Sequence, residues 1–268
     1  GRTAHLTKPT KLHLSQGRVQ CQARDECQAG CSFGSYFSTQ SSTLPAAAAT
    51  NNLHIAPNSV VHSLIYDEKT NRVKGVRIID NDDLSEREYF AKVVFVCAST
   101  IGSTQILMNS ISKKFPNGIA NSSGVLGHYL MDHNYNAGAS GDIEGFEDEI
   151  DKGRRPTGLI MPNFYYKPDA KRNFLRGYAL AGRAYREGWQ SIQHQDGLGV
   201  EYKNKLKQAG KWRFGLYAQG EMLPRFENKM SLHPTLKDKW GMPQIEFDCR
   251  FSDNETNMMI DAAEQAEK

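Results

Sequence analysis

Three cysteines near the beginning of the chain are the first residues whose type and spacing could support chemistry. Five residues separate Cys21 from Cys27, and three separate Cys27 from Cys31. Structural zinc sites use thiolates about two to four residues apart, in pairs that complete four ligands. Here the first spacing is too long, and no nearby His or Cys supplies a fourth ligand. We therefore expect packed or disulfide-bridged loop cysteines and assign no metal-binding residue.

The turn after a strongly apolar segment is the second candidate site. Residues 89–97 are almost continuously apolar, which predicts a strand buried on both faces, as in a parallel sheet. Ala98, Ser99 and Thr100 follow, and residues 102–112 have helical spacing. Small residues at the carboxyl end of a strand let a ligand approach the backbone. The segment therefore predicts half of a nucleotide-binding unit, although packing alone also explains small residues at such a joint.

Other patterns in the chain carry less chemical information. Asp132 and His133 are an acid–base pair by type, but adjacent strand residues point to opposite faces, so a direct interaction is not implied. The basic stretch 203–211 predicts a solvated helix face. The sequence contains no Gly-x-Gly-x-x-Gly, Gly-x-Ser-x-Gly or phosphate-loop pattern.

The composition is that of a globular protein, because hydrophobic residues make up 39% of the 268 positions and charged residues 24%. The 33 basic and 30 acidic side chains nearly balance, and no long basic block indicates a nucleic-acid partner. No apolar run approaches the ~18 residues of a membrane span. Five cysteines, an odd number, do not suggest a disulfide scaffold. The compartment stays open between cytoplasm and periplasm.

Strand and helix signals divide the chain into three regions. Residues 1–50 predict a long irregular connection with a short helix near 45–49. Residues 51–135 combine a short strand at 53–57 and a hairpin with the buried strand and helix described above, which is an α/β pattern. The two hairpin strands are expected at 60–66 and 73–79.

Residues 136–268 have a different character and predict an antiparallel sheet with insertions, an α+β pattern. A helix is expected to follow at 253–268. Aromatic-rich strand candidates lie at 159–166, 178–182, 212–218 and 244–249.

Five motif segments, in one order, carry a resemblance to a known family. They are Cys27-Gln28-Ala29-Gly30-Cys31 with Ser41-Ser42-Thr43-Leu44-Pro45, the hairpin around Val61 and Gly75-Val76, the strand–turn–helix segment 93–107, Gly124-Val125-Leu126-Gly127-His128-Tyr129-Leu130-Met131-Asp132-His133, and Glu221-Met222-Leu223-Pro224 with Asp238-Lys239-Trp240-Gly241-Met242-Pro243. Together they resemble the glucose–methanol–choline (GMC) oxidoreductases, in the bacterial gluconate-dehydrogenase-like and pyranose-oxidase-like branch.

The resemblance implies part of a Rossmann-like FAD-binding domain joined to an antiparallel-sheet substrate-binding domain, truncated at both ends. Residues 1–50 would be an extended connecting region, 51–135 the partial FAD-binding domain and 136–268 part of the substrate-binding domain. The family's flavin adenine is bonded through the backbone at the position of Val61.

Three further residues are expected to contact the cofactor, namely Ala98, Ser99 and Ser103 in the strand–turn–helix segment. Ser99 stands where the family usually has glycine, and Thr104 where it usually has proline.

The implied activity is oxidation of an alcohol group of a sugar, sugar acid or other polyol by hydride transfer to FAD. Family members begin with a Gly-x-Gly-x-x-Gly turn and end with a catalytic His, and this sequence has neither. We therefore expect a central fragment, inactive alone and poor at retaining FAD, whose partners are the missing N- and C-terminal segments and a small-molecule substrate. No catalytic residue is assigned. The substrate and the electron acceptor stay open.

Two other hypotheses compete with this one. The first is a non-catalytic, β-rich module that binds carbohydrate or protein, since aromatic strands suit sugar stacking. The second is a metal-binding regulator that uses Cys21, Cys27 and Cys31, and it predicts stoichiometric zinc. The aromatic strand residues allow two roles. Tyr217, for example, suits both the lining of a substrate cavity and an ordinary position in the hydrophobic core.

Overall fold

The fold is described by a computed structural model that covers residues 5–24, 27, 30–134, 137–149, 158–162, 171–188, 196–208 and 210–268. The chain divides into two compact units. Unit 1 comprises Gly1–His54, His133–Glu221 and Asp253–Lys268, and unit 2 comprises Ile55–Asp132 and Met222–Ser252. Residues 222–252 thus belong with 55–132, whereas the sequence-based boundaries placed them with 136–268.

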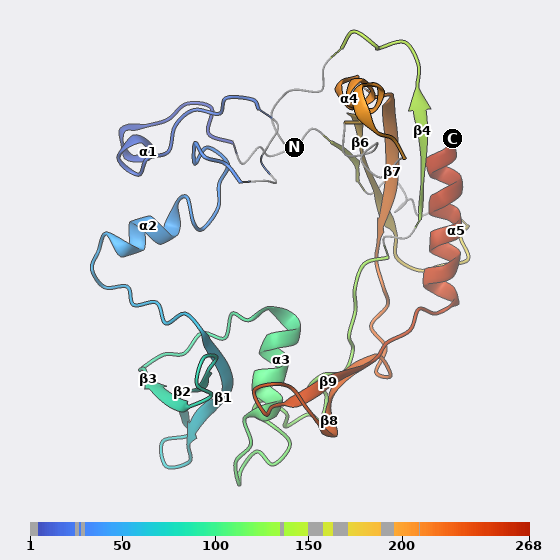
Figure 1. Cartoon of the computed structure of the whole chain (residues 1–268). Coiled ribbons are helices and arrows are strands. Elements are labelled where there is room, and N and C mark those ends of the chain that lie inside the picture. The colour runs from blue at the N-terminus through green and yellow to red at the C-terminus, as the bar shows by residue number, and fades with distance from the viewer. Residues whose placement is uncertain are drawn as a thin grey trace. The chain divides into compact units, whose positions relative to one another are not determined.

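Unit 1 contains a four-stranded antiparallel sheet (Figure 1). Its strands are β4 (Gly138–Ile143), β5 (Leu159–Met161), β6 (Tyr178–Arg186) and β7 (Trp212–Gly220), in the order β4-β7-β6-β5. The C-terminal helix α5 (Asp253–Glu267) packs on β4, β6 and β7. The predicted antiparallel sheet and final helix are therefore confirmed. The remainder of the strand candidate at 159–166, residues 163–166, lies outside the described residues.

The core of unit 1 lies between this sheet and α5. Leu180 on β6 is paired with Ala218 on β7, and both are fully buried. Met258 on α5 is buried against them. The hydroxyl of Tyr178 donates a hydrogen bond to Asp261 Oδ2 at 2.6 Å, which ties the sheet to the helix. An amphipathic helix and one sheet face thus bury each other, which is the ordinary way to stabilise such a pair.

The described residues of unit 1 also form three short helices. They are α1 (Lys11–Ser15), α2 (Thr43–Ala48) and α4 (Gly199–Lys207). The short helix predicted near 45–49 is therefore confirmed, and the basic stretch lies partly on α4, a helix with no buried residue. In the N-terminal loops Arg18 is buried, and it donates hydrogen bonds to the Gly34 carbonyl at 2.9 Å and to Ser42 Oγ at 3.1 Å.

Unit 2 contains a three-stranded antiparallel sheet in the order β1-β2-β3 and a two-stranded sheet. The predicted hairpin is confirmed as β1 (Ser59–Asp67) and β2 (Arg72–Asp80), with β3 (Glu86–Phe90) added at the edge. Helix α3 (Ser99–Asn109), which confirms the predicted helix, packs on β1. The Leu64 backbone N–H donates to Ser110 Oγ at 2.8 Å, which joins the sheet to the end of this helix.

The two-stranded sheet consists of β8 (Lys229–Lys237) and β9 (Pro243–Asp248). The strand candidate at 244–249 is therefore a strand, but it pairs with β8 instead of joining the sheet of unit 1.

Two strand predictions in this region are wrong. Residues 53–57 form no strand, and the buried strand expected at 89–97 ends at Phe90. Val93 and Phe95 are 65% and 83% exposed. Every strand pair in the described part of the chain is antiparallel. A strand buried on both faces needs neighbours on each side, and the described residues supply none here, so the apolar run stays open to solvent.

Candidate functional site

The start of α3 holds three of the four residues expected to contact a cofactor. Ala98 is the N-cap of α3, and its side chain makes no capping hydrogen bond. Ser99 is exposed and has a φ of 60°, in the left-handed region. Ser103 lies one turn further along and is half-buried. The backbone N–H groups at this helix start therefore have no side-chain cap, which suits an anionic group.

The fourth residue, Val61, lies on β1 of the same unit. It is half-buried and paired with Ile78 on β2, and the register of the two strands shifts immediately after it. Because α3 packs on β1, Val61 lies in the same unit as the three residues at the start of α3. Burial lowers the pKa of the neighbouring His62, and the Arg77 guanidinium lowers it further. This imidazole is therefore neutral at neutral pH.

The fit of a flavin nucleotide to this turn can be judged from the space around it. A Cβ placed on Gly102 would lie 3.2 Å from the Ala98 Cβ, so the helix start is closely built from small residues. Ala98 and Ser99 are both exposed, and no bulky side chain stands on the turn itself. A nucleotide can therefore approach the backbone closely. These residues fit the cofactor that the resemblance implies.

Tyr217 does not lie in the core of unit 1. It is 44% exposed, and it precedes the fully buried Ala218 on β7. Since consecutive strand residues alternate between faces, Tyr217 lies on the sheet face opposite α5. In the register it is paired with Gly138 on one side and Ala181 on the other, two small neighbours that leave its ring uncovered.

His133, half of the possible acid–base pair, is held by the backbone. Its Nδ1 donates to the carbonyl of Gly220 at 3.2 Å. The next residue, Asn134, is fully buried, and its amide donates to the Glu255 carbonyl at 3.2 Å. These contacts place the segment in the packing of unit 1.

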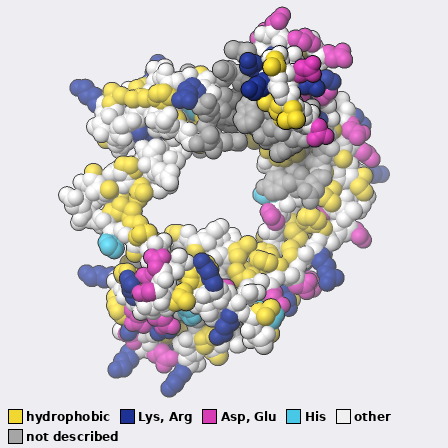
Figure 2. All heavy atoms as spheres, in the orientation of Figure 1, with side chains coloured by type: hydrophobic (Ala, Val, Ile, Leu, Met, Phe, Trp, Pro, Cys, Tyr) yellow, Lys and Arg dark blue, Asp and Glu magenta, His cyan; other side chains and the backbone are white. Residues whose placement is uncertain are grey.

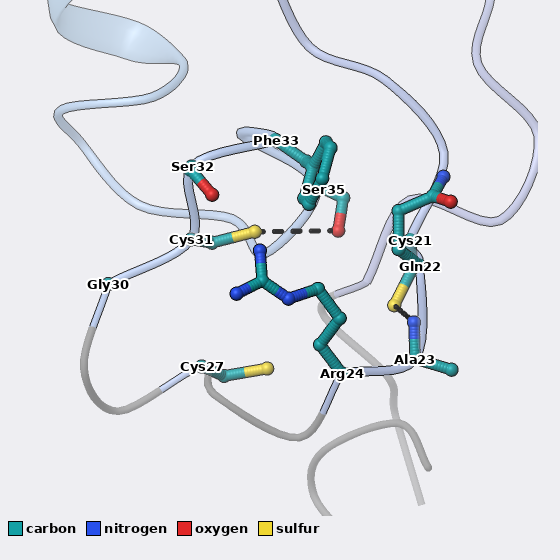
Figure 3. A pocket seen from close by; sticks show the side chains of 10 residues that line it. All are labelled: Cys21, Gln22, Ala23, Arg24, Cys27, Gly30, Cys31, Ser32, Phe33 and Ser35. Atoms are coloured by element: carbon teal, nitrogen blue, oxygen red, sulfur yellow. Dashed lines mark hydrogen bonds between the residues drawn. The ribbon is translucent and has the colours of Figure 1, made fainter. Parts of the chain in front are cut away.

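The three N-terminal cysteines line a single small pocket (Figure 3). None of them forms a disulfide. The side chains of Cys27 and Cys31 extend toward the side chain of Arg24, and Cys21 lies on the other side of it. The buried His5 places its Nε2 3.1 Å from Cys27 Sγ. A histidine therefore does stand beside these cysteines, contrary to the sequence-based expectation.

His5 escaped prediction because it precedes Cys27 by 22 positions, outside any local motif. Within the described part of the chain, no group of three or more His, Cys, Asp or Glu side chains is arranged to hold a metal ion. No helix among the described residues has both the length and the apolar character needed to cross a membrane.

Comparison with known proteins identifies relatives across both units. Residues 13–135 match the family model of the GMC oxidoreductases. The 2-methyl-1,2-propanediol dehydrogenase of Mycolicibacterium austroafricanum is 30% identical over 184 residues, which cover 65% of this chain and 32% of that enzyme. The fructose dehydrogenase large subunit of Gluconobacter japonicus is 26% identical over 233 residues, which cover 86% of this chain and 41% of that subunit.

The matched parts span about a third and two fifths of the lengths of these relatives. The family match includes both the cysteine loops and the strand–turn–helix segment that the motifs singled out. The resemblance that the ordered motifs indicated is therefore confirmed: residues 13–135 match the GMC oxidoreductase family, and the chain is similar to both dehydrogenases.

Proposed function

We propose that this chain is the central section of an FAD-dependent dehydrogenase that oxidises an alcohol group of a sugar, sugar acid or other polyol. The observation that carries the proposal is the pair of relatives, whose names describe dehydrogenases of a diol and of fructose. The family match over residues 13–135 supports FAD as the cofactor.

Val61, Ala98, Ser99 and Ser103 would hold the nucleotide of the flavin, mainly through the backbone. Bound FAD supplies the hydride acceptor for alcohol oxidation, and the protein supplies orientation and electrostatics. The uncapped start of α3 would contribute N–H donors to a negatively charged part of the nucleotide. The small side chains of Ala98 and Ser99 would keep that approach open.

The sheet face opposite α5 is the proposed substrate side of unit 1. Tyr217 is exposed on that face, and Tyr185 lies on the same face four residues from Ala181 along β6. Aromatic rings with a hydroxyl suit polyol recognition, because they combine an apolar surface with a hydrogen-bonding end. Tyr217 would therefore line the substrate cavity.

The exposed apolar residues in segment 89–97 are what we expect of a central section of a larger enzyme. Val93 and Phe95 belong to a segment that is rich in β-branched and aromatic residues, yet it is uncovered here. Large exposed apolar surface is uncommon in a monomeric protein and marks a surface that another element covers. We propose that other sections of the same enzyme pack on Val93 and Phe95, and that these sections also contain the catalytic residues. The chain alone is then inactive and retains FAD poorly.

The test uses the whole natural protein that contains this chain. Mixing the flavin-loaded protein anaerobically with fructose, other sugars and diols should bleach the flavin absorbance with at least one of them. Ala98→Glu, which places a negative charge at the start of α3, should lower FAD affinity by about tenfold, or about 1.4 kcal/mol. Leu236→Glu is the matched control, because Leu236 is exposed on β8 of the same unit.

Two results would count against the proposal. If no alcohol reduced the flavin, the dehydrogenase assignment would be wrong. If Ala98→Glu and Leu236→Glu lowered FAD occupancy equally, the turn before α3 would not be the cofactor site. A protein that bound no flavin but bound sugars would favour the non-catalytic carbohydrate-binding module instead.

A further inference from the structure

The cysteine pocket of unit 1 has a chemistry that alcohol oxidation by flavin does not use. Its position is fixed by the backbone, because Leu6 N donates to Ser35 O at 2.8 Å and Cys21 N donates to Leu6 O at 2.9 Å. Three separate stretches of the N-terminal region are thereby joined around the pocket. His5 is carried into it by the same contacts and packs against the ring of Tyr36, with 5.1 Å between ring centroids.

Cys27 lies beside a potential proton acceptor. Its Sγ is 3.1 Å from His5 Nε2, and the His5 side chain is buried. A cysteine in hydrogen-bond contact with a histidine is the usual arrangement of an activated thiol, since the imidazole takes the proton and the imidazolium then stabilises the thiolate. The contact therefore predicts a nucleophilic Cys27.

Cys31 stands in the same pocket and also favours the thiolate. Burial raises the pKa of the Cys31 thiol, but hydrogen bonds from the backbone of Tyr36, Phe33 and Ser35 and from the Ser35 hydroxyl outweigh it, so the pKa is lowered. Its Sγ is 3.7 Å from Ser35 Oγ. Both Cys27 and Cys31 are only half-buried, so a small solute can reach them.

We propose that Cys27 and Cys31 form a peroxide-sensitive dithiol that two-electron oxidation converts into a disulfide. Sites of this kind combine an activated, accessible thiol with a second cysteine that resolves the first oxidation product. The three features are present here in His5, Cys27 and Cys31. The proposal goes beyond the dehydrogenase activity and does not depend on it.

The oxidant is a hydroperoxide, and the steps balance. The Cys27 thiolate attacks one peroxide oxygen, the O–O bond breaks, and the leaving oxygen takes from solvent the proton that the Cys31 thiol has released, to give an alcohol, or water from hydrogen peroxide. Cys27 is then a sulfenic acid. The Cys31 thiolate attacks its sulfur, the S–O bond breaks, and the departing hydroxide takes the proton held on His5 and leaves as water. Two thiols lose two electrons and two protons to form one S–S bond.

The experiment treats the reduced whole chain with hydrogen peroxide and then digests it with trypsin without reduction. Cleavage after Arg24 separates Cys21 from the other two, because the next Lys or Arg is Lys69. A Cys27–Cys31 disulfide therefore lowers the mass of a single peptide, 25–69, by two hydrogens. A bridge to Cys21 would instead link two peptides. We expect the first product, and we expect it before Cys97 and Cys249 react, although both of these are exposed.

Variants separate the roles of the residues. Cys31→Ser should prevent the disulfide and leave Cys27 as a sulfenic acid that dimedone traps. His5→Gln should slow the reaction by about tenfold, as expected when a thiol loses its activating partner. Cys21→Ser is the matched control, and it should leave the rate and the product unchanged.

Three results would overturn the proposal. The first is oxidation of all five cysteines at equal rates. The second is a dominant bridge to Cys21. The third is a metal bound stoichiometrically to the purified chain and released when Cys27 or Cys31 is replaced, because the thiolates would then be metal ligands.

Discussion

The β4–β7 sheet of unit 1 and the β1–β3 sheet of unit 2 differ in how each is covered. The first is covered by α5, and Tyr178, Leu180 and Ala218 are buried beneath that helix. In unit 2, α3 packs on β1, but Val93 and Phe95 after the edge strand are open to solvent. Figure 2 shows hydrophobic side chains exposed among the charged ones on this chain.

The hydrophobic pattern of a segment therefore indicates how many of its faces need to be buried. It does not show whether the described chain supplies the element that buries them. At the C-terminal end of β7 the exposed Tyr217 and the half-buried Gln219 alternate with the buried Ala218 and Gly220, as a sheet with one covered face requires. The run at 89–97 does not alternate, so it needs cover on both faces. The described residues of unit 1 cover one face of its sheet with α5, whereas the described residues of unit 2 leave the apolar run at 89–97 uncovered.

The largest expected effect comes from truncating an aromatic side chain in the covered region. Phe174 is 8% exposed and belongs to the core under α5. Phe174→Ala should lower the free energy of unfolding of unit 1 by about 3 kcal/mol or more, because the transfer free energy of the ring is lost and a cavity is left. Urea unfolding, followed by hydrogen exchange of β6 and β7 peptides, measures it. An effect under about 1 kcal/mol would show that this core is not closed.

An intermediate effect is expected from adding a methyl group inside the β1–β3 sheet. A Cβ on Gly75 would lie 2.2 Å from the backbone oxygen of Tyr89, which cannot move without disturbing the β2–β3 pairing. Gly75→Ala should therefore destabilise unit 2 by about 1–3 kcal/mol.

Gly215→Ala in β7 is the matched control for that change. Its Cβ would meet Ser140 Cβ at 3.6 Å, an ordinary contact, so it should be neutral or slightly stabilising through the lower entropy of the unfolded chain. Hydrogen exchange of peptides from each sheet measures both variants. Equal losses in the two sheets would show that the register of β2 and β3 differs from the one described.

The smallest expected effect comes from Phe95→Ala, the same chemical change as Phe174→Ala at an uncovered position. Because Phe95 is 83% exposed, the free energy of unfolding of the chain should change by no more than about 0.5 kcal/mol. In the whole enzyme, where we propose that the segment is covered, the same substitution should cost about 3 kcal/mol or more. Paired urea titrations of both proteins give the two values. If Phe95→Ala lowered the free energy of unfolding equally little in both, the proposal that other sections cover this segment would be wrong.

Much of the fold follows from local sequence patterns. The β1–β2 hairpin, the strands β6, β7 and β9, and the helices α3 and α5 were all predictable from periodicity and turn residues. Strand β4 was not, because Gly-Ala-Ser-Gly-Asp-Ile has no apolar alternation, and it forms by pairing with β7. The pairing of β9 with β8 was also beyond prediction, since periodicity identifies a strand but not its neighbour.

The candidate site was predictable to a similar extent. The joint at Ala98 and Ser99 stood out because small residues follow an apolar run, and a helix does follow it, although α3 begins at Ser99, three residues before the expected start at Gly102. The neighbour of Cys27 was not predictable, because His5 reaches it through loop packing and not through sequence spacing. Likewise, the exposure of Tyr217 depends on which sheet face α5 covers, a tertiary choice that the strand pattern leaves open.

The most direct test of the dehydrogenase assignment is the visible absorption spectrum of the whole natural protein, purified beside this 268-residue chain. We predict flavin absorption bands in the whole protein and little or none in the chain alone. A whole protein that is colourless, and that FAD cannot reconstitute, would contradict the account. Full flavin occupancy in the chain alone would contradict its position as a central section of a larger enzyme.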